Sequence, residues 1–259
     1  MRKDTGIQLD HADIVVTHKC NMHCPHCIDP LVNTSDDIVS VPAVDRFMRA
    51  LRDHMPHQDM DILFLGGEPT CAGLVRLKAL TSCVRSHGFR PIISTNGLDK
   101  SLIKWIQPEF DWVQVTTHSA EETAYWAEQN DTWNNINLKI AGDGRMTYEK
   151  LMDFIDLDAS FRRRSVSMYF TPDFKELCTD KDVWALLDTM DWERNGSYMY
   201  AMYEGVRFKK CIPSVTNIVD EPTVPKLYPN GNYNKTWCNE ELDDYLSEDR
   251  WNAKKEEEQ

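Results

Sequence analysis

The sequence lacks any long apolar run. No uncharged stretch approaches the ~20 apolar residues that a membrane-spanning helix needs. Residues 1–6 run directly into polar sequence, without the apolar segment and small-residue cleavage site of a secretory signal. These two absences predict a cytoplasmic protein that does not enter membranes and whose thiols stay reduced.

The sequence has fewer basic residues than acidic ones. The chain has 29 Lys and Arg against 42 Asp and Glu, which gives a formal net charge of -13. Residues 240–259 hold nine acidic and three basic side chains, and we expect the tail at 254–259 to be solvated. The rest of the chain is still acidic, which argues against a protein that grips naked duplex nucleic acid by neutralising its phosphates.

Strand-like and helix-like segments alternate along most of the 259 residues. The expected strands are 13–17, 61–65, 91–94, 112–117, 136–140 and 166–170, and the expected helices are 41–55, 74–87, 100–106, 121–129, 148–157 and 181–190. Six such units in succession predict an α/β fold with a parallel sheet and helical crossovers. Right-handed crossovers would wind this sheet into an open or partly closed barrel, with chemistry at the mouth formed by the loops after the strands.

The alternating pattern ends near residue 195. We therefore predict a core domain at 1–194 and a small C-terminal extension at 195–259, which includes the acidic tail. The Tyr- and Met-rich segment 198–203 could close over a substrate, or it could be a buried strand of the scaffold. No clear repeat marks the structure of the remaining extension.

Three cysteines lie within eight residues in the loop after the first expected strand. Cys20, Cys24 and Cys27 form a C-x-x-x-C-x-x-C arrangement that can reach one metal centre. A zinc knuckle is one interpretation, with His18, His23 or His26 as the fourth ligand, and three structural cysteines are another. An iron-sulfur cluster normally takes four thiolates, so three would leave one iron open to a non-protein ligand.

This spacing resembles the signature of the radical S-adenosylmethionine (radical SAM) enzymes. Two further segments match that family in order, each at the end of an expected strand. Residues 66–69, Gly-Gly-Glu-Pro, resemble its G-G-E-P motif, and residues 94–97, Ser-Thr-Asn-Gly, are similar to another strand-end segment. The similarity covers roughly residues 13–190 and implies a partial (β/α)6 TIM-like barrel with a small irregular C-terminal extension.

The resemblance implies two cofactors. Cys20, Cys24 and Cys27 would hold a [4Fe-4S] cluster, whose open iron would bind the amino and carboxylate groups of S-adenosyl-L-methionine (SAM). The turn at 66–68 would bind the methionine amino group, because glycines allow close backbone approach and a carboxylate attracts an ammonium. The residues expected to contact SAM are Gly66, Gly67, Glu68, Ser94, Thr95, Asn96, His26 and His118.

Simpler structural roles exist for most of these SAM contacts. Residues 66–69 could be a plain strand-to-helix turn, and an Asn-Gly cap explains residues 94–97 without a ligand. His118 is equally well explained as a hydrogen-bonded scaffold histidine. His26 stands before the third cysteine, where many family members have an aromatic residue whose backbone meets the adenine. Residues 141–144 follow the fifth strand, in a region that often contacts adenine in the family, but they match its pattern only loosely.

The activity implied by the resemblance is reductive cleavage of SAM. An external electron donor such as flavodoxin or ferredoxin would reduce the cluster, and a 5′-deoxyadenosyl radical would then remove a hydrogen atom from the substrate. That substrate could be a peptide or protein, or a nucleoside or other small molecule. The competing class is a non-enzymatic binding protein stabilised by zinc or a cluster.

Five cysteines lie outside this motif. Cys211 and Cys238, with the turn at 228–232, look like the auxiliary-cluster extension of peptide-modifying members, but no second C-x-x-C group follows. Two thiolates do not hold a cubane, so the extension could instead shape the substrate pocket or be unrelated. Cys71, Cys83 and Cys178 are expected to be small buried hydrophobic residues.

Overall fold

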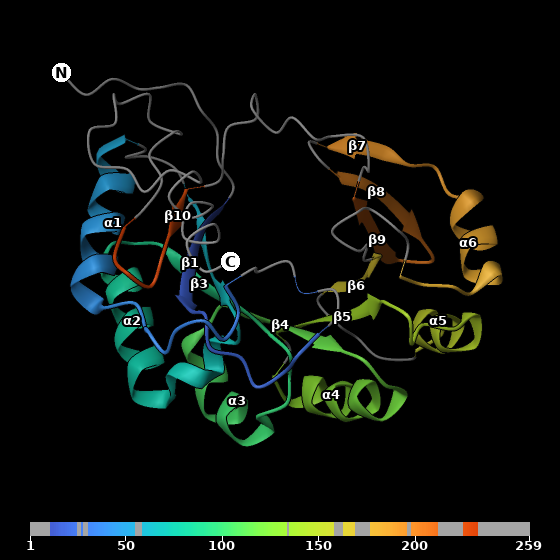
Figure 1. Cartoon of the computed structure of the whole chain (residues 1–259), viewed down its shortest axis with the longest axis horizontal. Coiled ribbons are helices and arrows are strands. Elements are labelled where there is room, and N and C mark those ends of the chain that lie inside the picture. The colour runs from blue at the N-terminus through green and yellow to red at the C-terminus, as the bar shows by residue number, and fades with distance from the viewer. Residues whose placement is uncertain are drawn as a thin grey trace.

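The protein folds around one ten-stranded sheet in a computed structural model (Figure 1). The structure describes residues 11–24, 27, 31–54, 59–133, 135–157, 163–168, 177–195, 198–211 and 225–232. The strands are β1 (His11–Thr17), β2 (Asp61–Gly66), β3 (Arg90–Thr95), β4 (Trp112–Thr117), β5 (Ile136–Gly142), β6 (Arg163–Met168), β7 (Glu193–Asn195), β8 (Tyr198–Tyr203), β9 (Val206–Cys211) and β10 (Lys226–Leu227).

Within the described residues, six α-helices alternate with the strands and lie along one side of the sheet (Figure 1). They are α1 (Val41–His54), α2 (Leu74–Ser86), α3 (Lys100–Ile106), α4 (Ala120–Trp133), α5 (Tyr148–Ile155) and α6 (Lys181–Asp188), with short 3-10 helices η1 (Pro69–Ala72) and η2 (Gln107–Glu109). None of the helices in the described ranges is long and apolar enough to span a membrane.

Strands β1 to β6 are parallel and neighbour one another in chain order, as the alternating pattern predicts. The full order is β10-β1-β2-β3-β4-β5-β6-β9-β8-β7. Because β10 and β7 are separate edges, the sheet does not close, and the predicted partial barrel is confirmed in its open form. The carboxyl ends of β1 to β6 all meet at one mouth because these strands are parallel.

The two faces of the sheet differ in composition. On β4, Val113 and Val115 are fully buried against the helices, whereas Gln114 and Thr116 on the opposite face are half-buried. We call the face that the helices cover the outer face and the other the inner face. This alternation follows from the two-residue period of a strand. On the helix side, α1 completes the core by burying Phe47 fully.

Most of the helices begin after residues whose side chains accept backbone N–H groups. Asp99 caps α3 by accepting from Leu102 N–H, and Thr147 caps α5 by accepting from Lys150 N–H. Asp180 caps α6 and also accepts from the N–H of Tyr148, at the start of α5. Such caps satisfy N–H groups that have no partner within the helix.

Beyond residue 195, where the sequence showed no clear repeat, the described residues add three strands to the same sheet. β9 is parallel to β6, β8 is antiparallel to β9, and β10 is parallel to β1. Segment 198–203 is therefore a scaffold strand rather than a lid, in which Ala201 is 5% exposed and Met202 64%. The sixth strand begins at Arg163, three residues before the predicted start.

Candidate active site

The cysteine loop begins where β1 ends, and Asn33 holds its start in place. The N–H of Cys20 donates to Asn33 Oδ1 at 2.8 Å, while the N–H of Asn33 donates to His18 O at 2.7 Å. Asn33 has φ of 60°, in the left-handed region that asparagine adopts more readily than most residues. Sequence reasoning did not identify Asn33, although an asparagine near the end of a cysteine loop is the residue type that such a turn favours.

The three cysteine thiols share one electrostatic environment. Burial raises the pKa of Cys20 and of Cys24, and both lie partly buried, whereas Cys27 is exposed. Cys24 further raises the pKa of Cys20, and Cys27 further raises that of Cys24. The charge of one thiol thus acts on the next, although the three sulfurs do not all lie within 4.8 Å of one another. A cation at their centre would relieve that repulsion, so the donor set fits a thiolate-bound metal cluster.

The glycines at the end of β2 and directly after it allow the turn to dock on the cysteine loop. Gly67 N–H donates to Thr17 O at 2.8 Å, and Glu68 N–H donates to Lys19 O at 2.8 Å. A Cβ atom added at Gly66 would overlap Thr17 O, and one added at Gly67 would overlap Lys19 O. The glycines were expected to admit a ligand. In the structure they admit the backbone of the cysteine loop.

Glu68 is buried behind this turn, with 1% of its surface exposed. Its Oε1 accepts from Thr70 N–H at 3.0 Å and from the hydroxyls of Thr70 and Thr95, each at 2.7 Å. Its Oε2 accepts from Asn96 N–H at 2.7 Å. Burial raises the pKa of the carboxyl, and these hydrogen bonds oppose the rise. Glu68 thus ties the turn after β2 to the end of β3.

The end of β3 is tied in turn to the cysteine loop. Asn96 Nδ2 donates to Asn21 Oδ1 at 2.7 Å. Ser94 lies on the inner face, where its Oγ accepts from Gln114 Nε2 at 3.1 Å. The structure therefore brings the predicted residues of β3 together with the cysteine loop and with Glu68.

Cys71 lies beside this group rather than in the hydrophobic core. It stands in η1, where burial and then Glu68 raise the pKa of its thiol, and the N–H of Asn21 donates to its sulfur. Cys71 in turn raises the pKa of Cys20. The expectation of full burial holds for Cys178, which is 1% exposed, whereas Cys71 and Cys83 are only half-buried.

A second group of polar residues stands at the ends of β4 and β5. Arg145 Nη2 lies 2.6 Å from Asp143 Oδ2 and 2.6 Å from His118 Nδ1. A guanidinium only donates, so His118 Nδ1 accepts and the ring proton sits on Nε2. Burial, followed by the charge of Arg145, lowers the pKa of His118, which agrees with a neutral ring. His118 therefore acts as a hydrogen-bonded support for Arg145.

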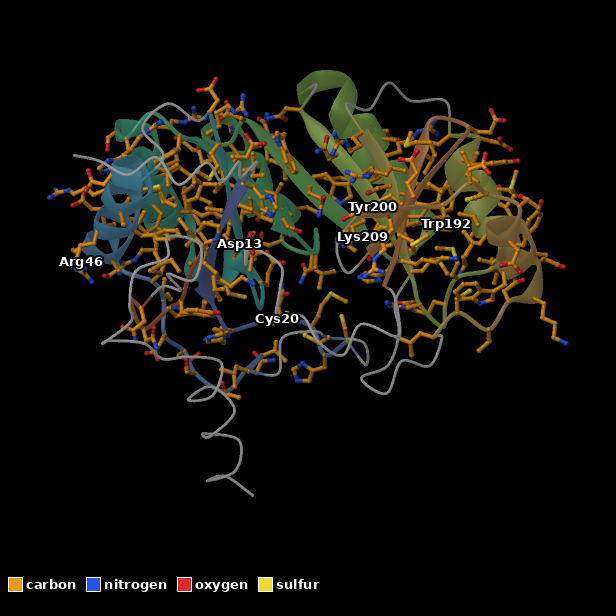
Figure 2. The ribbon with its side chains drawn as sticks, turned by 90° about the horizontal axis from the view of Figure 1, so that it is seen from above. Asp13, Cys20, Arg46, Trp192, Tyr200 and Lys209 are labelled. Carbon is orange, nitrogen blue, oxygen red and sulfur yellow. The ribbon has the colours of Figure 1, made fainter. Side chains whose placement is uncertain are left out.

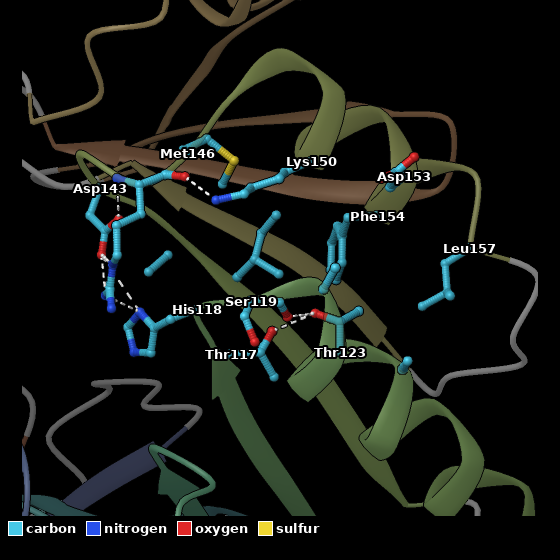
Figure 3. A pocket seen from close by; sticks show the side chains of 15 residues that line it. Thr117, His118, Ser119, Thr123, Asp143, Met146, Lys150, Asp153, Phe154 and Leu157 are labelled. Atoms are coloured by element: carbon cyan, nitrogen blue, oxygen red, sulfur yellow. Dashed lines mark hydrogen bonds and ion pairs between the residues drawn. The ribbon is translucent and has the colours of Figure 1, made fainter.

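Two cavities meet at the Asp143–Arg145 pair. One, of about 300 Å³, is lined by residues 22–24 of the cysteine loop, by residues 143–145 and by Leu177. The other, of about 220 Å³, runs between α4 and α5, with His118 and Asp143 at one end and Leu157 towards the other (Figure 3). Arg145 also lowers the pKa of Cys24, so its charge reaches the cysteine loop.

Asp143 and Arg145 were not among the predicted site residues. In the sequence they stand in a turn of one acidic residue, one glycine and one basic residue, directly after a strand. This segment resembled the family pattern only loosely. His26 and Cys238, also singled out from the sequence, lie outside the described residues. Cys211 is the last residue of β9.

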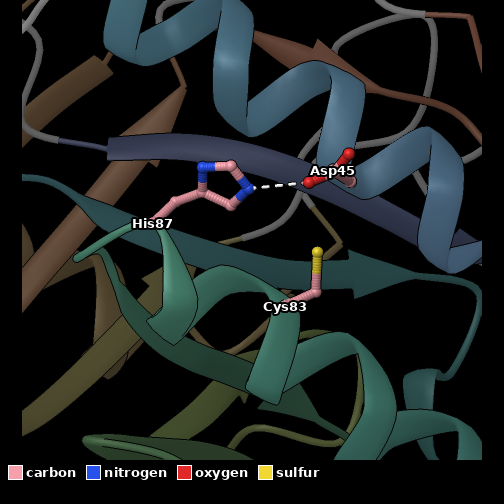
Figure 4. A group of neighbouring side chains, drawn as sticks. All are labelled: Asp45, Cys83 and His87. Atoms are coloured by element: carbon pink, nitrogen blue, oxygen red, sulfur yellow. Dashed lines mark hydrogen bonds and ion pairs between the residues drawn. The ribbon is translucent and has the colours of Figure 1, made fainter.

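Another set of potential metal ligands lies on the outer helices, away from the mouth (Figure 4). One ligand atom each from Asp45, Cys83 and His87 lies within 4.8 Å of the others. His87 Nε2 is 2.9 Å from Asp45 Oδ1, and Arg49 Nη2 is 2.7 Å from Asp45 Oδ2. Because both carboxylate oxygens already have cationic or polar partners, this cluster serves as a polar contact between α1 and α2.

Comparison with protein families gives one match, to the model of the radical SAM superfamily over residues 14–177. No curated protein matches the sequence. Among solved structures, native anSMEcpe with bound AdoMet is 18% identical, with a TM-score of 0.51 over 64% of this chain and 53% of that one. SuiB from Streptococcus suis is 13% identical, with a TM-score of 0.55 over 86% of this chain and 59% of that one.

These two solved structures show a shared fold. The chain spans only about half to three fifths of their length, and their sequences have diverged far from it.

Proposed function

This chain belongs to the radical SAM superfamily, and on that premise we propose that it holds a [4Fe-4S] cluster through Cys20, Cys24 and Cys27 and uses it to cleave SAM. The observation that carries the proposal is the convergence of three segments at the mouth of the sheet. The cysteine loop, the turn after β2 and the end of β3 are joined by the hydrogen bonds of Gly67, Glu68 and Asn96.

Three thiolates leave one iron of such a cluster without a protein ligand, which suits a small molecule with an amine and a carboxylate. When bound, the cluster would supply one electron to SAM, which would split at its sulfonium into methionine and a 5′-deoxyadenosyl radical able to remove a hydrogen atom from the substrate. The protein's part is to orient SAM and the substrate and to exclude water. An external flavodoxin or ferredoxin would supply the electron.

We assign the methionine end of SAM to the turn at Gly66, Gly67 and Glu68. A carboxylate has about four acceptor positions. Oε1 of Glu68 is occupied by three donors, while Oε2 has one donor among the described residues. Oε2 therefore keeps capacity for an ammonium. Thr95 and Asn96 are assigned as positioning residues that aim this carboxylate, and Ser94 as a neighbouring hydroxyl on the inner face.

Arg145 extends the proposed site beyond the predicted residues. It borders the cavity next to Cys24, and Asp143 and His118 fix its orientation. We assign His118 a positioning role through Arg145. His26 keeps its predicted role near the adenine. The division into a core at 1–194 and an extension at 195–259 is likewise retained as a proposal.

The proposal is tested by anaerobic reconstitution followed by reaction with SAM and dithionite. We expect about four iron and four sulfide per chain, and formation of 5′-deoxyadenosine. Cys24→Ala should abolish both the full cluster and the product. Cys178→Ala removes a thiol buried elsewhere and should leave both unchanged. Retention of zinc without sulfide would instead establish a zinc-stabilised binding protein.

A further inference from the structure

The inner face of the sheet carries a group of cationic side chains. On β9, Val206 and Phe208 are fully buried on the outer face, so the alternation of the strand places Arg207 and Lys209 on the inner face. By the same reasoning Lys139 lies on the inner face of β5, between the buried Leu138 and Ile140.

The register of the strands sets these cations close to one another. Lys139 pairs with Ser165 on β6, and Ser165 pairs with Arg207 on β9. Lys139 and Arg207 are thus two strands apart, or about 10 Å. Lys209 lies one inner-face position further along β9, opposite Ser167 and Tyr200. Three cations therefore share a patch of three adjacent strands.

Ring contacts confirm that these side chains share a face. The guanidinium of Arg207 lies 4.3 Å from the centre of the Tyr200 ring, and the Lys209 ammonium lies 5.9 Å from it. Burial raises the pKa of Asp13 on β1, and Lys209 is among the cations that oppose this rise. Asp13 and Lys209 lie on opposite sides of the inner space, and Cys20 is near its edge (Figure 2).

The sign of the charge on this face contrasts with that of the whole chain. Acidic residues outnumber basic ones by 42 to 29 overall, yet on the described strands β4 to β9 the only inner-face acidic residue is Glu193 of β7, opposite Tyr200. Two neighbouring cations on the outer face also have contacts of their own. Arg164 donates to the carbonyl oxygens of Phe154 and Ile155 at the end of α5, and Lys210 lies over the ring of Trp192.

We propose that the substrate is a small polyanion, a phosphate ester or phosphoanhydride, whose anionic end binds Lys139, Arg207 and Lys209 on the inner face. This inference rests on the proposed function, because it takes the anion to be the substrate of that reaction. Arg and Lys form strong charge-assisted hydrogen bonds with phosphate oxygens, and Ser165 and Ser167 add hydroxyl donors between them. A patch about 10 Å across matches two or three adjoining phosphates.

The test is calorimetric titration of the reconstituted holoenzyme with inorganic tripolyphosphate, beside a pentaglutamate peptide of similar charge. We expect tripolyphosphate to bind, more weakly as salt rises, and the peptide to bind at least tenfold more weakly. Lys139→Gln, Arg207→Gln and Lys209→Gln should each weaken tripolyphosphate binding about tenfold or more. Lys209→Arg should retain most of it.

The matched control is Lys210→Gln, which removes the same charge from the adjacent outer-face position. Its affinity for tripolyphosphate should equal that of the unmodified protein, and equal weakening by Lys209→Gln and Lys210→Gln would overturn the inference. Tighter binding of pentaglutamate would overturn it in favour of an acidic peptide.

The formation of 5′-deoxyadenosine tests the proposed function, and the binding of tripolyphosphate tests the anion site separately. Holoenzyme that forms 5′-deoxyadenosine but binds no tripolyphosphate would refute only the polyanion site. Protein that binds tripolyphosphate as expected but holds no cluster would refute the proposed function and leave the anion site standing.

Discussion

Glu68 is the residue on which the geometry of the mouth depends most. Its carboxylate accepts hydrogen bonds from Thr70, Thr95 and Asn96, which come from two different segments of the chain. A buried acceptor with four donors is costly to replace, because each donor left without a partner loses its solvation as well as its hydrogen bond. The positions of the turn after β2 and the end of β3 are therefore coupled through one side chain.

Because Glu68 is buried, the free energy of unfolding should depend on pH. Because burial raises the pKa of Glu68 above its ordinary 4.5, the folded state holds the proton more tightly than the unfolded state. Glu68 then contributes stability that is fully present below pH 4.5 and is lost as pH rises through the folded pKa. Each unit of the rise corresponds to about 1.4 kcal/mol.

Glu68→Gln should lack this contribution, which urea unfolding of both proteins across the acidic range would measure. The glutamine amide also presents N–H groups where Oε2 accepted from Asn96, so the Asn96 amide should exchange with deuterium faster in the variant. Identical pH profiles for the two proteins would contradict the prediction.

At the level of elements, backbone contacts hold the cysteine loop against the turn after β2. The hydrogen bonds from Gly67 and Glu68 continue the pairing of β1 with β2 beyond the last paired residues. No side chain fits between the two backbones at Gly66 or Gly67. The cysteine loop therefore depends on β2 as much as on β1.

Gly67→Ala should separate these two segments. The added methyl group would overlap Lys19 O and His18 O, and relieving the overlap requires a backbone shift that costs about 1–3 kcal/mol. We expect a lower melting temperature and an incomplete cluster after reconstitution.

Gly144→Ala is the matched control for this variant. Its added Cβ would lie 3.5 Å from Leu177 O, an ordinary contact, so its stability should be unchanged. Full cluster content in Gly67→Ala would show that the close approach of the two backbones is dispensable.

At the level of the whole molecule, residues from both ends of the described chain meet at one edge of the sheet. β10 pairs with β1, and Lys226 Nζ lies 3.4 Å from Asp13 Oδ2. Asp13 is 6% exposed, and its Oδ1 has no hydrogen-bond partner among the described residues. A buried carboxylate in this situation depends on its cation for compensation.

Lys226→Met should destabilise the protein because it leaves the Asp13 carboxylate buried with less compensation. The expected loss is about 1–3 kcal/mol, less than for a fully buried pair because the lysine is partly exposed. The double variant Asp13→Asn/Lys226→Met removes the charge and should recover most of the loss. Thermal unfolding measures both variants, and a double variant no more stable than Lys226→Met would contradict this account.

The amino-acid sequence by itself determined the class of fold and predicted the nature of the centre. The alternation of segments predicted six parallel strands with their helices, because side-chain periodicity is a local property of a strand or helix. Cys20, Cys24 and Cys27 were identifiable for the same reason, since all three lie on one loop. Glu68 and Asn96 were found through short motifs at strand ends.

Only the tertiary structure decided which distant residues meet. The Arg145–His118 contact joins residues 27 positions apart. Cys71, which follows β2 in the chain, raises the pKa of Cys20 in the cysteine loop. The basic inner face arises because strand register aligns Lys139 with Arg207, which nothing in either local sequence specifies. Register and crossover depend on the packing of the entire sheet, so they become visible only when the chain is folded.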